Sequence, residues 1–283
     1  MMRLVSHNVL VNDDVAELQT GVVTMIEEAV NSPDMVELLA DQVMAFARAL
    51  DLAPVAGAAR AAVVTDISWQ CAIPDTIHWN FLRNKFSEYD VQSGAITIDN
   101  NMICVLLSLQ DAIVTDVAIN ELKTLLFVKG LHEIGHALTT YCLHILRQIC
   151  TGAPANKTRK IPEINTPPKA GKMLQGRRIV GDAGSSFEEL LTNGLRFTYE
   201  FTAQQHSKVH RLTLVDWNGV NGFYLPAQFT SDVIESPGNF YTLSHAYLAD
   251  HTVLIPISPH TLSTTVIRNA HGSQPPDPPH IKT

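Results

Sequence analysis

The sequence has few cysteines, no long apolar run and no apolar leader. Its four cysteines are widely spaced and form no Cys-x-x-Cys pair, so reduced thiols are the expected state. It has no run of about eighteen apolar residues, which argues against a transmembrane helix. Residues 1–8 lack the apolar core of a signal peptide. We therefore expect a cytoplasmic protein that does not bind membranes, although a mature secreted form would begin in the same way.

Charge is also scarce, and its balance is acidic. Only 17% of the 283 residues are charged, and the net charge of −8 argues against a general nucleic-acid binder. Apolar residues make up 46% of the chain, which is enough for a sizeable core. The composition indicates a globular protein of one large domain or two lobes.

The most informative stretch is His132-Glu133-Ile134-Gly135-His136, which has the pattern HExxH. Residues four apart lie on one face of a helix, so His132 and His136 can bind the same ion. Two neutral imidazoles suit Zn²⁺ and leave room for a third protein ligand and a water. Glu133 follows the first histidine and can act on that water as a general base. The alternative is a buried helix whose histidines are structural.

The surrounding residues favour a helix with one buried face. Apolar residues recur at spacings of three, four and seven, and both histidines fall on a neighbouring face. Cys142 lies six positions beyond His136, about 9 Å along a continuous helix, so it is rejected as a ligand. The apolar positions are Phe127, Leu131, Ile134, Leu138, Ile145 and Ile149.

A second candidate stretch, residues 181–194, leads from glycines and serines into a predicted helix. Ser186 and Glu189 have the spacing of a capping box, which leaves Glu188 free. A glutamate on a second helix can complete a zinc site of two histidines, and Gly194 would let the two helices approach. Glu188 is therefore the predicted third ligand, with Glu189 next, although both could be first-turn acids stabilised by the helix dipole. More remote alternatives are Asp182, His144, His206 and His210.

Several other elements follow from the pattern. Helices are predicted at 14–31 and 35–50, and a helix of residues 102–109 begins at Asn100 or Asn101. Strands are predicted at 61–67, 95–99, 212–217 and 223–226, and residues 195–201 are expected to continue the second-motif helix.

Two segments outside these elements have a biased composition. Residues 151–180 contain seven Lys or Arg and one Glu, together with several Pro and Gly. This composition is typical of a solvated loop, and a lid or a segment that selects acidic partners is the alternative. Residues 271–283 are rich in proline and are predicted to form a disordered tail.

The predicted active site also requires a side chain that stabilises the oxyanion. Zinc hydrolases commonly use a Tyr or His donor for the tetrahedral intermediate. Tyr241 and His245 are the candidates, together with Tyr247 in the same run. A core-lining aromatic run is the alternative for each of them.

HExxH followed by a glutamate on a downstream helix resembles the gluzincin zinc metallopeptidases. The segment from Gly181 to Gly194 is similar to that of a group of fungal HExxH proteins, in which Gly-Glu-Ser-Gly precedes the glutamate and Gly-Gly follows it. Here Asp182, Ala183 and Asn193 replace Glu, Ser and the first of the paired glycines. The gap from the second histidine to the glutamate is longer than in thermolysin-like enzymes, so the resemblance does not fix the subfamily.

The resemblance implies that His132, His136 and Glu188 bind Zn²⁺ and that Glu133 is the base. It also implies a zincin-like α+β fold, with a small mixed sheet, an active-site helix and a mostly helical C-terminal lobe. In such peptidases an edge strand lies along the cleft and pairs with extended substrate. The strand at 95–99 is a candidate for this role, and an ordinary core strand is the alternative.

We therefore expect a single catalytic domain at 1–270, with an N-lobe at 1–150, a C-lobe at 181–270 and the basic loop between them. The expected reaction is zinc-dependent hydrolysis of a peptide or protein substrate. A catalytically silent zincin that binds a protein partner is one alternative, and a metal-independent helical interaction protein is another. The sequence does not indicate the cleavage preference or the oligomeric state.

Overall fold

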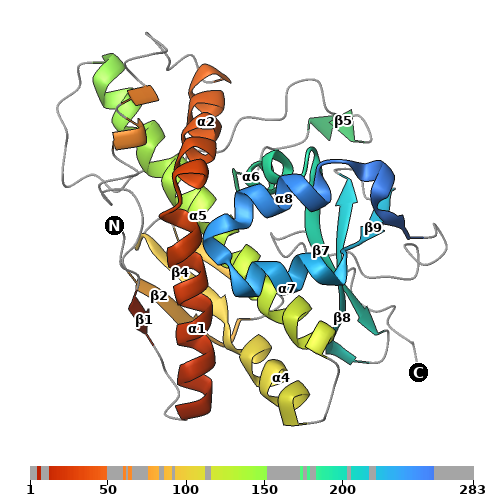
Figure 1. Cartoon of the computed structure of the whole chain (residues 1–283). Helices are drawn as coiled ribbons and strands as arrows, with labels where there is room; N and C mark the ends of the chain where they lie inside the picture. The colour runs from red at the N-terminus through yellow and green to blue at the C-terminus, as the bar shows by residue number, and fades with distance from the viewer. Residues whose placement is uncertain are drawn as a thin grey trace, which may run out of the picture.

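The described residues combine helices with two four-stranded sheets and one two-stranded sheet, as the α+β prediction requires (Figure 1). The computed structural model describes residues 5–7, 13–49, 60–61, 63–65, 76–82, 86–90, 93–111, 116–151, 173–174, 177–178, 183–202, 205–216 and 221–257. Among the described residues, no helix combines the length and the apolar character needed to cross a membrane.

The two helices predicted for the N-terminal part of the chain are present. They are α1 (Asp13–Val30) and α2 (Pro33–Ala49). The break falls at Ser32-Pro33, where proline takes the first position of α2 and the Met35 N–H donates to Ser32 Oγ at 3.3 Å. The predicted apolar stripe of α1 is buried at Val15, Val22, Ile26 and Val30.

The first sheet has the order β1-β2-β4-β3. Its strands are β1 (Val5–His7), β2 (Thr76–Asn80), β3 (Ser87–Asp90) and β4 (Ala95–Asp99). β1, β2 and β4 run parallel, whereas β3 is antiparallel to β4 and forms one edge. The strand predicted at 95–99 is therefore confirmed as β4, but it is an interior strand, and its neighbour β3 is an edge strand.

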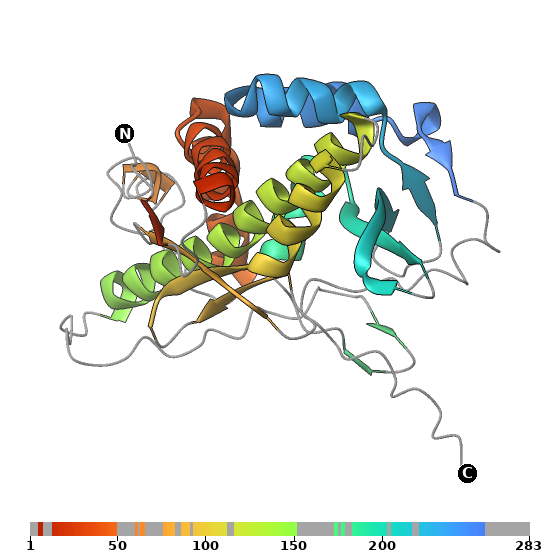
Figure 2. The same ribbon diagram turned by 90° about the horizontal axis from the view of Figure 1, so that it is seen from below.

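The central element is α5 (Asp116–Thr151), which follows α4 (Asn100–Asp111). Helices α1 and α7 pack on one side of α5, and strands β3 and β4 pack on the other (Figure 2). The predicted stripe is buried at Phe127, Leu131, Ile134 and Leu138. Apolar side chains thus fix the rotation of α5 about its axis.

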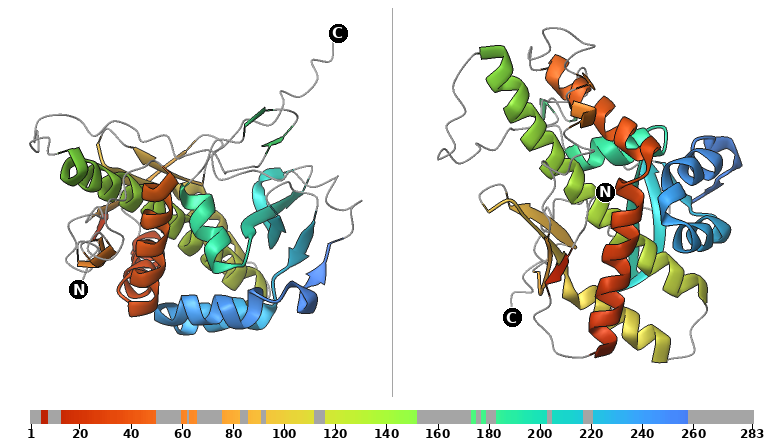
Figure 3. Two further views of the ribbon diagram at one scale, coloured as in Figure 1. Left: turned by 90° about the horizontal axis from the view of Figure 1, so that it is seen from above. Right: turned by 60° about the vertical axis from the view of Figure 1, so that its left-hand side comes forward.

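The C-terminal half contains a second sheet, so the expectation of a mostly helical lobe is wrong. The antiparallel sheet has the order β10-β9-β8-β7. Short helices accompany it, with α7 and α8 on the far side of α1 and α5 from the first sheet (Figure 3). The elements are α6 (Ala183–Leu191), β7 (Leu195–Thr202), β8 (Gln205–Asp216), β9 (Gly222–Tyr224), α7 (Ala227–Glu235), η1 (Pro237–Asn239), α8 (Phe240–Leu248), η2 (His251–Val253) and β10 (Ile255–Pro256).

The helix predicted to continue through 195–201 ends instead at a left-handed turn. Asn193 has φ 54° and Gly194 has φ 105°, and the Gly194 N–H donates to the Glu189 carbonyl at 2.7 Å. After the turn, apolar and polar residues alternate from Leu195 to Thr202, which is the period of a strand. Nothing lies within 4 Å of a Cβ built on Gly194, so this glycine ends α6 and does not serve helix packing.

Two further predictions are corrected or confirmed. The described residues of 60–65 are helical, so the strand predicted at 61–67 is wrong. The predicted strands at 212–217 and 223–226 are confirmed as the end of β8 and as β9. Of the basic segment at 151–180, the structure describes Thr151 and the short pair β5 (Met173–Leu174) and β6 (Arg177–Arg178). The tail at 271–283 lies outside the described residues.

One continuous cluster of buried apolar residues runs from α1 to the residues just before β10. It includes Ile26 of α1, Ile98 of β4, Phe127 of α5, Phe187 of α6 and Phe240 of α8. The two four-stranded sheets therefore pack through the same core, with α5 between them.

Candidate metal site

His132 and His136 lie together on the face of α5 that neighbours its apolar stripe. Their ring centroids are 5.1 Å apart. The His132 side chain is fully buried, and the Nε2 atoms of both rings are inaccessible to solvent. Helical spacing therefore brings the two imidazoles into the neighbourhood that a shared ion requires.

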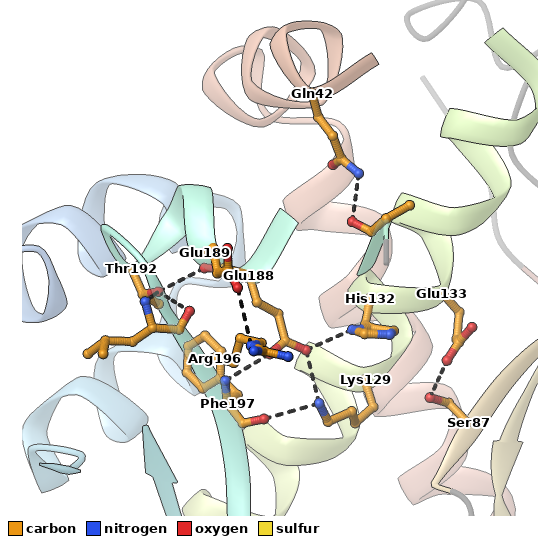
Figure 4. Close-up of polar contacts among 12 residues, drawn as sticks. Gln42, Ser87, Lys129, His132, Glu133, Glu188, Glu189, Thr192, Arg196 and Phe197 are labelled. Atoms are coloured by element: carbon orange, nitrogen blue, oxygen red, sulfur yellow. Dashed lines mark hydrogen bonds and ion pairs between the residues drawn. The ribbon is translucent and has the colours of Figure 1, made fainter. Parts of the chain in front are cut away.

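Glu188 of α6 meets His132 on the opposite side of the ring from Nε2 (Figure 4). Its Oε1 atom lies 2.8 Å from His132 Nδ1 and accepts from Lys129 Nζ at 2.9 Å. Its Oε2 atom accepts from the Phe197 N–H at 2.8 Å. Lys129 Nζ also donates to the Phe197 carbonyl at 3.3 Å. One carboxylate thus links α5, α6 and β7.

The surroundings of Glu188 favour its ionised form. Burial opposes its charge most strongly, but the positive charge of Lys129 and the hydrogen bonds from His132 and Lys129 outweigh burial and lower the pKa of this carboxyl. An ionised carboxylate only accepts hydrogen bonds, so His132 Nδ1 must carry the proton. In a neutral His132 the ring lone pair that can bind a metal then lies on Nε2.

This geometry bears on the predicted third ligand. A metal at Nε2 of His132 would lie on the other side of the ring from Glu188, whose oxygens are both engaged by N–H donors. Direct ligation would require Glu188 to leave these partners. Within the described ranges, no three His, Cys, Asp or Glu side chains form a group that could hold a metal. Glu189 instead pairs with Arg196 Nε at 3.2 Å.

Glu133 points to the first sheet. Ser87 Oγ, at the start of edge strand β3, donates to Glu133 Oε1 at 2.7 Å, and both side chains are buried (Figure 4). The contact joins the HExxH helix to an edge strand of the first sheet. The predicted base is therefore held beside a strand edge.

The first turn of α6 packs directly on the His132 ring. A Cβ built on Gly184 would overlap the Cγ, Cδ2 and Nε2 atoms of His132. Gln42 of α2 fixes this turn, since its Nε2 donates to the Ala183 carbonyl at 2.7 Å and to Thr139 Oγ1 at 3.1 Å. Glycine is required at this close approach.

The predicted capping box is not formed. The helix begins at Ala183, so Ser186 is inside its first turn and is not the N-cap. Glu189 forms an ion pair with Arg196 of β7. The start of α6 is set by its packing on α2 and α5, which local sequence does not reveal.

Substituting Gly184 by alanine is expected to lower the free energy of unfolding by about 1–3 kcal/mol, because the methyl group overlaps a buried ring that Glu188 prevents from moving. Gly21→Ala is the matched control. Gly21 is also helical, but nothing lies within 4 Å of its added Cβ, so this change should stabilise α1 by about 0.5–1 kcal/mol. Chemical denaturation of both variants measures the contrast, and equal effects would contradict the packing.

The acid dependence of stability should carry the signature of Glu188. Its pKa lies below the ordinary value of 4.5 in the folded protein, so its contribution is fully present above that value and is lost as pH falls through the lower folded pKa. The difference in free energy of unfolding between the wild type and Glu188→Gln should therefore shrink from pH 6 towards acid. A constant difference would contradict an ionised Glu188.

The predicted oxyanion donors lie on α8, away from this network. Tyr241 and His245 contact each other, with ring centroids 4.5 Å apart, and His245 is exposed. In the part of the chain that the structure describes, neither Tyr241 nor His245 forms a polar contact with His132, Glu133 or Glu188. Tyr247 donates to Asp232 Oδ2 at 2.7 Å and so ties α8 to α7. Of the alternative ligands, Asp182 lies outside the described residues, whereas His144 belongs to α5, and His206 and His210 belong to β8.

Two residues of the site were not predicted from the sequence. Lys129 is the single charged residue in the apolar run from Leu125 to Leu131. A lysine in such a run needs a buried partner, so the sequence could have indicated a buried ion pair here. Ser87 gave no signal, because only the fold brings it to Glu133.

Protein-family models, curated proteins and solved structures yielded no match to this chain. The residues of the site therefore carry the functional inference by themselves.

Proposed function

We propose that the protein is a zinc-dependent peptidase of the zincin type. The observation that carries this proposal is that His132 and His136 lie together on one buried helix face. Glu133, which follows His132 in the sequence, points to the edge strand β3. Two imidazoles on one helix face with a glutamate next to the first are the residues that a zinc peptidase needs to bind the ion and activate a water.

The donor set fits a zinc ion in part. His132 and His136 would hold the ion, and a zinc site normally adds a third protein ligand and an open position. Glu188 was the expected third ligand, and its contacts with Nδ1, Lys129 and Phe197 favour a supporting role instead. Asp182, which directly precedes α6 in the sequence, is the alternative candidate for the third ligand.

A zinc ion held by His132 and His136 would supply Lewis-acid polarisation of the scissile carbonyl and of the attacking water. Glu133 accepts the proton of that water on a carboxylate oxygen and returns it to the leaving amine. Ser87 donates to Oε1 of Glu133 and so restricts the rotation of the carboxylate, which leaves Oε2 for the proton. Burial of both side chains limits the bulk water that competes for this position.

The edge strand indicates how a substrate would bind. Among the described residues β3 pairs on one side, with β4, and its first residue contacts the proposed base. An extended peptide that adds to this edge would run past Glu133, with its main chain bound independently of its sequence. Extended or unfolded peptide segments are therefore the proposed substrate class.

A library of unstructured peptides tests the proposal, with cleavage products detected by mass spectrometry. Cleavage is expected with the zinc-loaded wild type, should stop on addition of a chelator, and should return when zinc is restored. His136→Ala is the control for contaminating peptidases and should be inactive. Zinc binding without cleavage of any peptide would favour the alternative of a silent zincin that binds a partner.

A further inference from the structure

Lys129 is a charged side chain in the core. It is 1% exposed and lies on α5 one turn before His132, with Glu188, also 1% exposed, as its ion-pair partner. A buried ammonium is costly unless it is paired and hydrogen-bonded. A lysine that only needed to fill space would be replaced at lower cost by an apolar residue, so this charge calls for a specific explanation.

We propose that Lys129 is a positioning residue of the candidate metal site: it fixes the Glu188 carboxylate against Nδ1 of His132, and thereby keeps Nε2 as the ligand atom. This inference rests on the proposed function, because it assigns Lys129 and Glu188 to support of the histidine and not to the metal itself. Lys129 reaches neither the metal nor the substrate in this role and acts through Glu188.

The hydrogen-bond geometry supports the role. Three N–H donors converge on Glu188, from Lys129, His132 and the Phe197 main chain. Lys129 also donates to the carbonyl of Phe197, and the N–H of the same residue donates to Oε2 of Glu188. Phe197 of β7 therefore anchors both members of the ion pair. The carboxylate therefore has one orientation that satisfies every donor, and in that orientation Oε1 faces Nδ1.

The position of Lys129 also argues against direct ligation by Glu188. An ammonium 2.9 Å from a carboxylate oxygen competes with a metal cation for the same lone pairs and repels the cation. A carboxylate that only orients histidine has no such conflict. Carboxylates that bind the second nitrogen of a ligating histidine typically change metal affinity about 10–100-fold when removed.

The first experiment is nitrogen-15 NMR of histidine side chains in the metal-free full-length chain at one neutral pH, with His132 assigned by His132→Asn. The wild type should show His132 protonated at Nδ1. Glu188→Gln should lose this preference, because glutamine offers one acceptor oxygen to three donors. The double variant Lys129→Met/Glu188→Gln carries no unpaired buried charge, should fold, and should also lose the preference. A folded double variant with the wild-type signal would overturn the inference.

The second experiment measures zinc affinity by competition with a chelator. Glu188→Gln and the double variant should each bind zinc about 10–100-fold more weakly than the wild type, and the control Lys123→Met, elsewhere on α5, should not. Complete loss of stoichiometric zinc in Glu188→Gln with an unchanged His132 signal would make Glu188 a ligand and overturn the inference. A wild type that binds no zinc but shows the Nδ1 signal would refute the proposed function and leave the Glu188–His132 arrangement intact.

Discussion

Replacing Glu133 by glutamine is expected to lower kcat/KM for peptide cleavage by about 10²–10⁴-fold, because glutamine cannot accept the proton of the attacking water. The substitution keeps the size of the side chain and an oxygen that accepts from Ser87, so the fold and zinc content should not change. Cleavage rates of wild type and variant, measured with one fluorogenic peptide at equal zinc occupancy, give the effect.

Glu189→Gln is the matched control for this loss. Glu189 is a half-buried glutamate that forms an ion pair with Arg196 and has no proposed part in the reaction, so its substitution should leave kcat/KM nearly unchanged. A Glu133→Gln variant that cleaves as fast as the wild type would remove Glu133 as the base. Equal losses in both variants would point to a general structural effect.

Lys129→Met is expected to lower the free energy of unfolding by about 3–5 kcal/mol. The substitution keeps most of the apolar stem but leaves the Glu188 charge buried with its strongest partner removed. Adding Glu188→Gln should recover part of the loss, because the double variant contains neither buried charge. Urea denaturation of the wild type, both single variants and the double variant forms a cycle that measures the coupling.

Lys123→Met provides the control on the same helix. Lys123 is half-buried and its substitution should change the free energy of unfolding by less than about 0.5 kcal/mol. Additive effects of Lys129→Met and Glu188→Gln would contradict the ion pair. The cycle measures how much the Lys129–Glu188 pair contributes to the free energy of unfolding. Which nitrogen of His132 carries the proton tests whether the pair positions that ring.

The sequence predicts the long helix and the helices before it well, because their apolar residues repeat with helical period over many turns. Phe127, Leu131 and Ile134 are buried as expected, and Ser32-Pro33 ends one helix and starts the next. The strand β7 was missed although Leu195 to Thr202 alternates between apolar and polar residues. The sequence predicts a helix-packing role for Gly194, whereas its positive φ marks the turn into the strand.

The part of the site that lies on one helix, α5, could be predicted from the sequence. Four-residue spacing places His132 beside His136, and the expected approach of Glu188 to His132 across two helices is present. The nitrogen that Glu188 contacts was not predictable, since it depends on how Gly184, Gln42 and the β7 main chain position α6. Contacts between residues distant in sequence decide whether a carboxylate binds a metal or a histidine.

Zinc content is the most direct test of the metal site. Purified wild type and the variants His132→Ala, Glu188→Ala and Asp182→Ala would be loaded with zinc, desalted and measured by elemental mass spectrometry. We predict one zinc per wild-type chain, none in His132→Ala, and weakened but detectable binding in Glu188→Ala. Loss in Asp182→Ala would identify the third ligand. A wild type that retains no zinc after loading would contradict the metallopeptidase assignment.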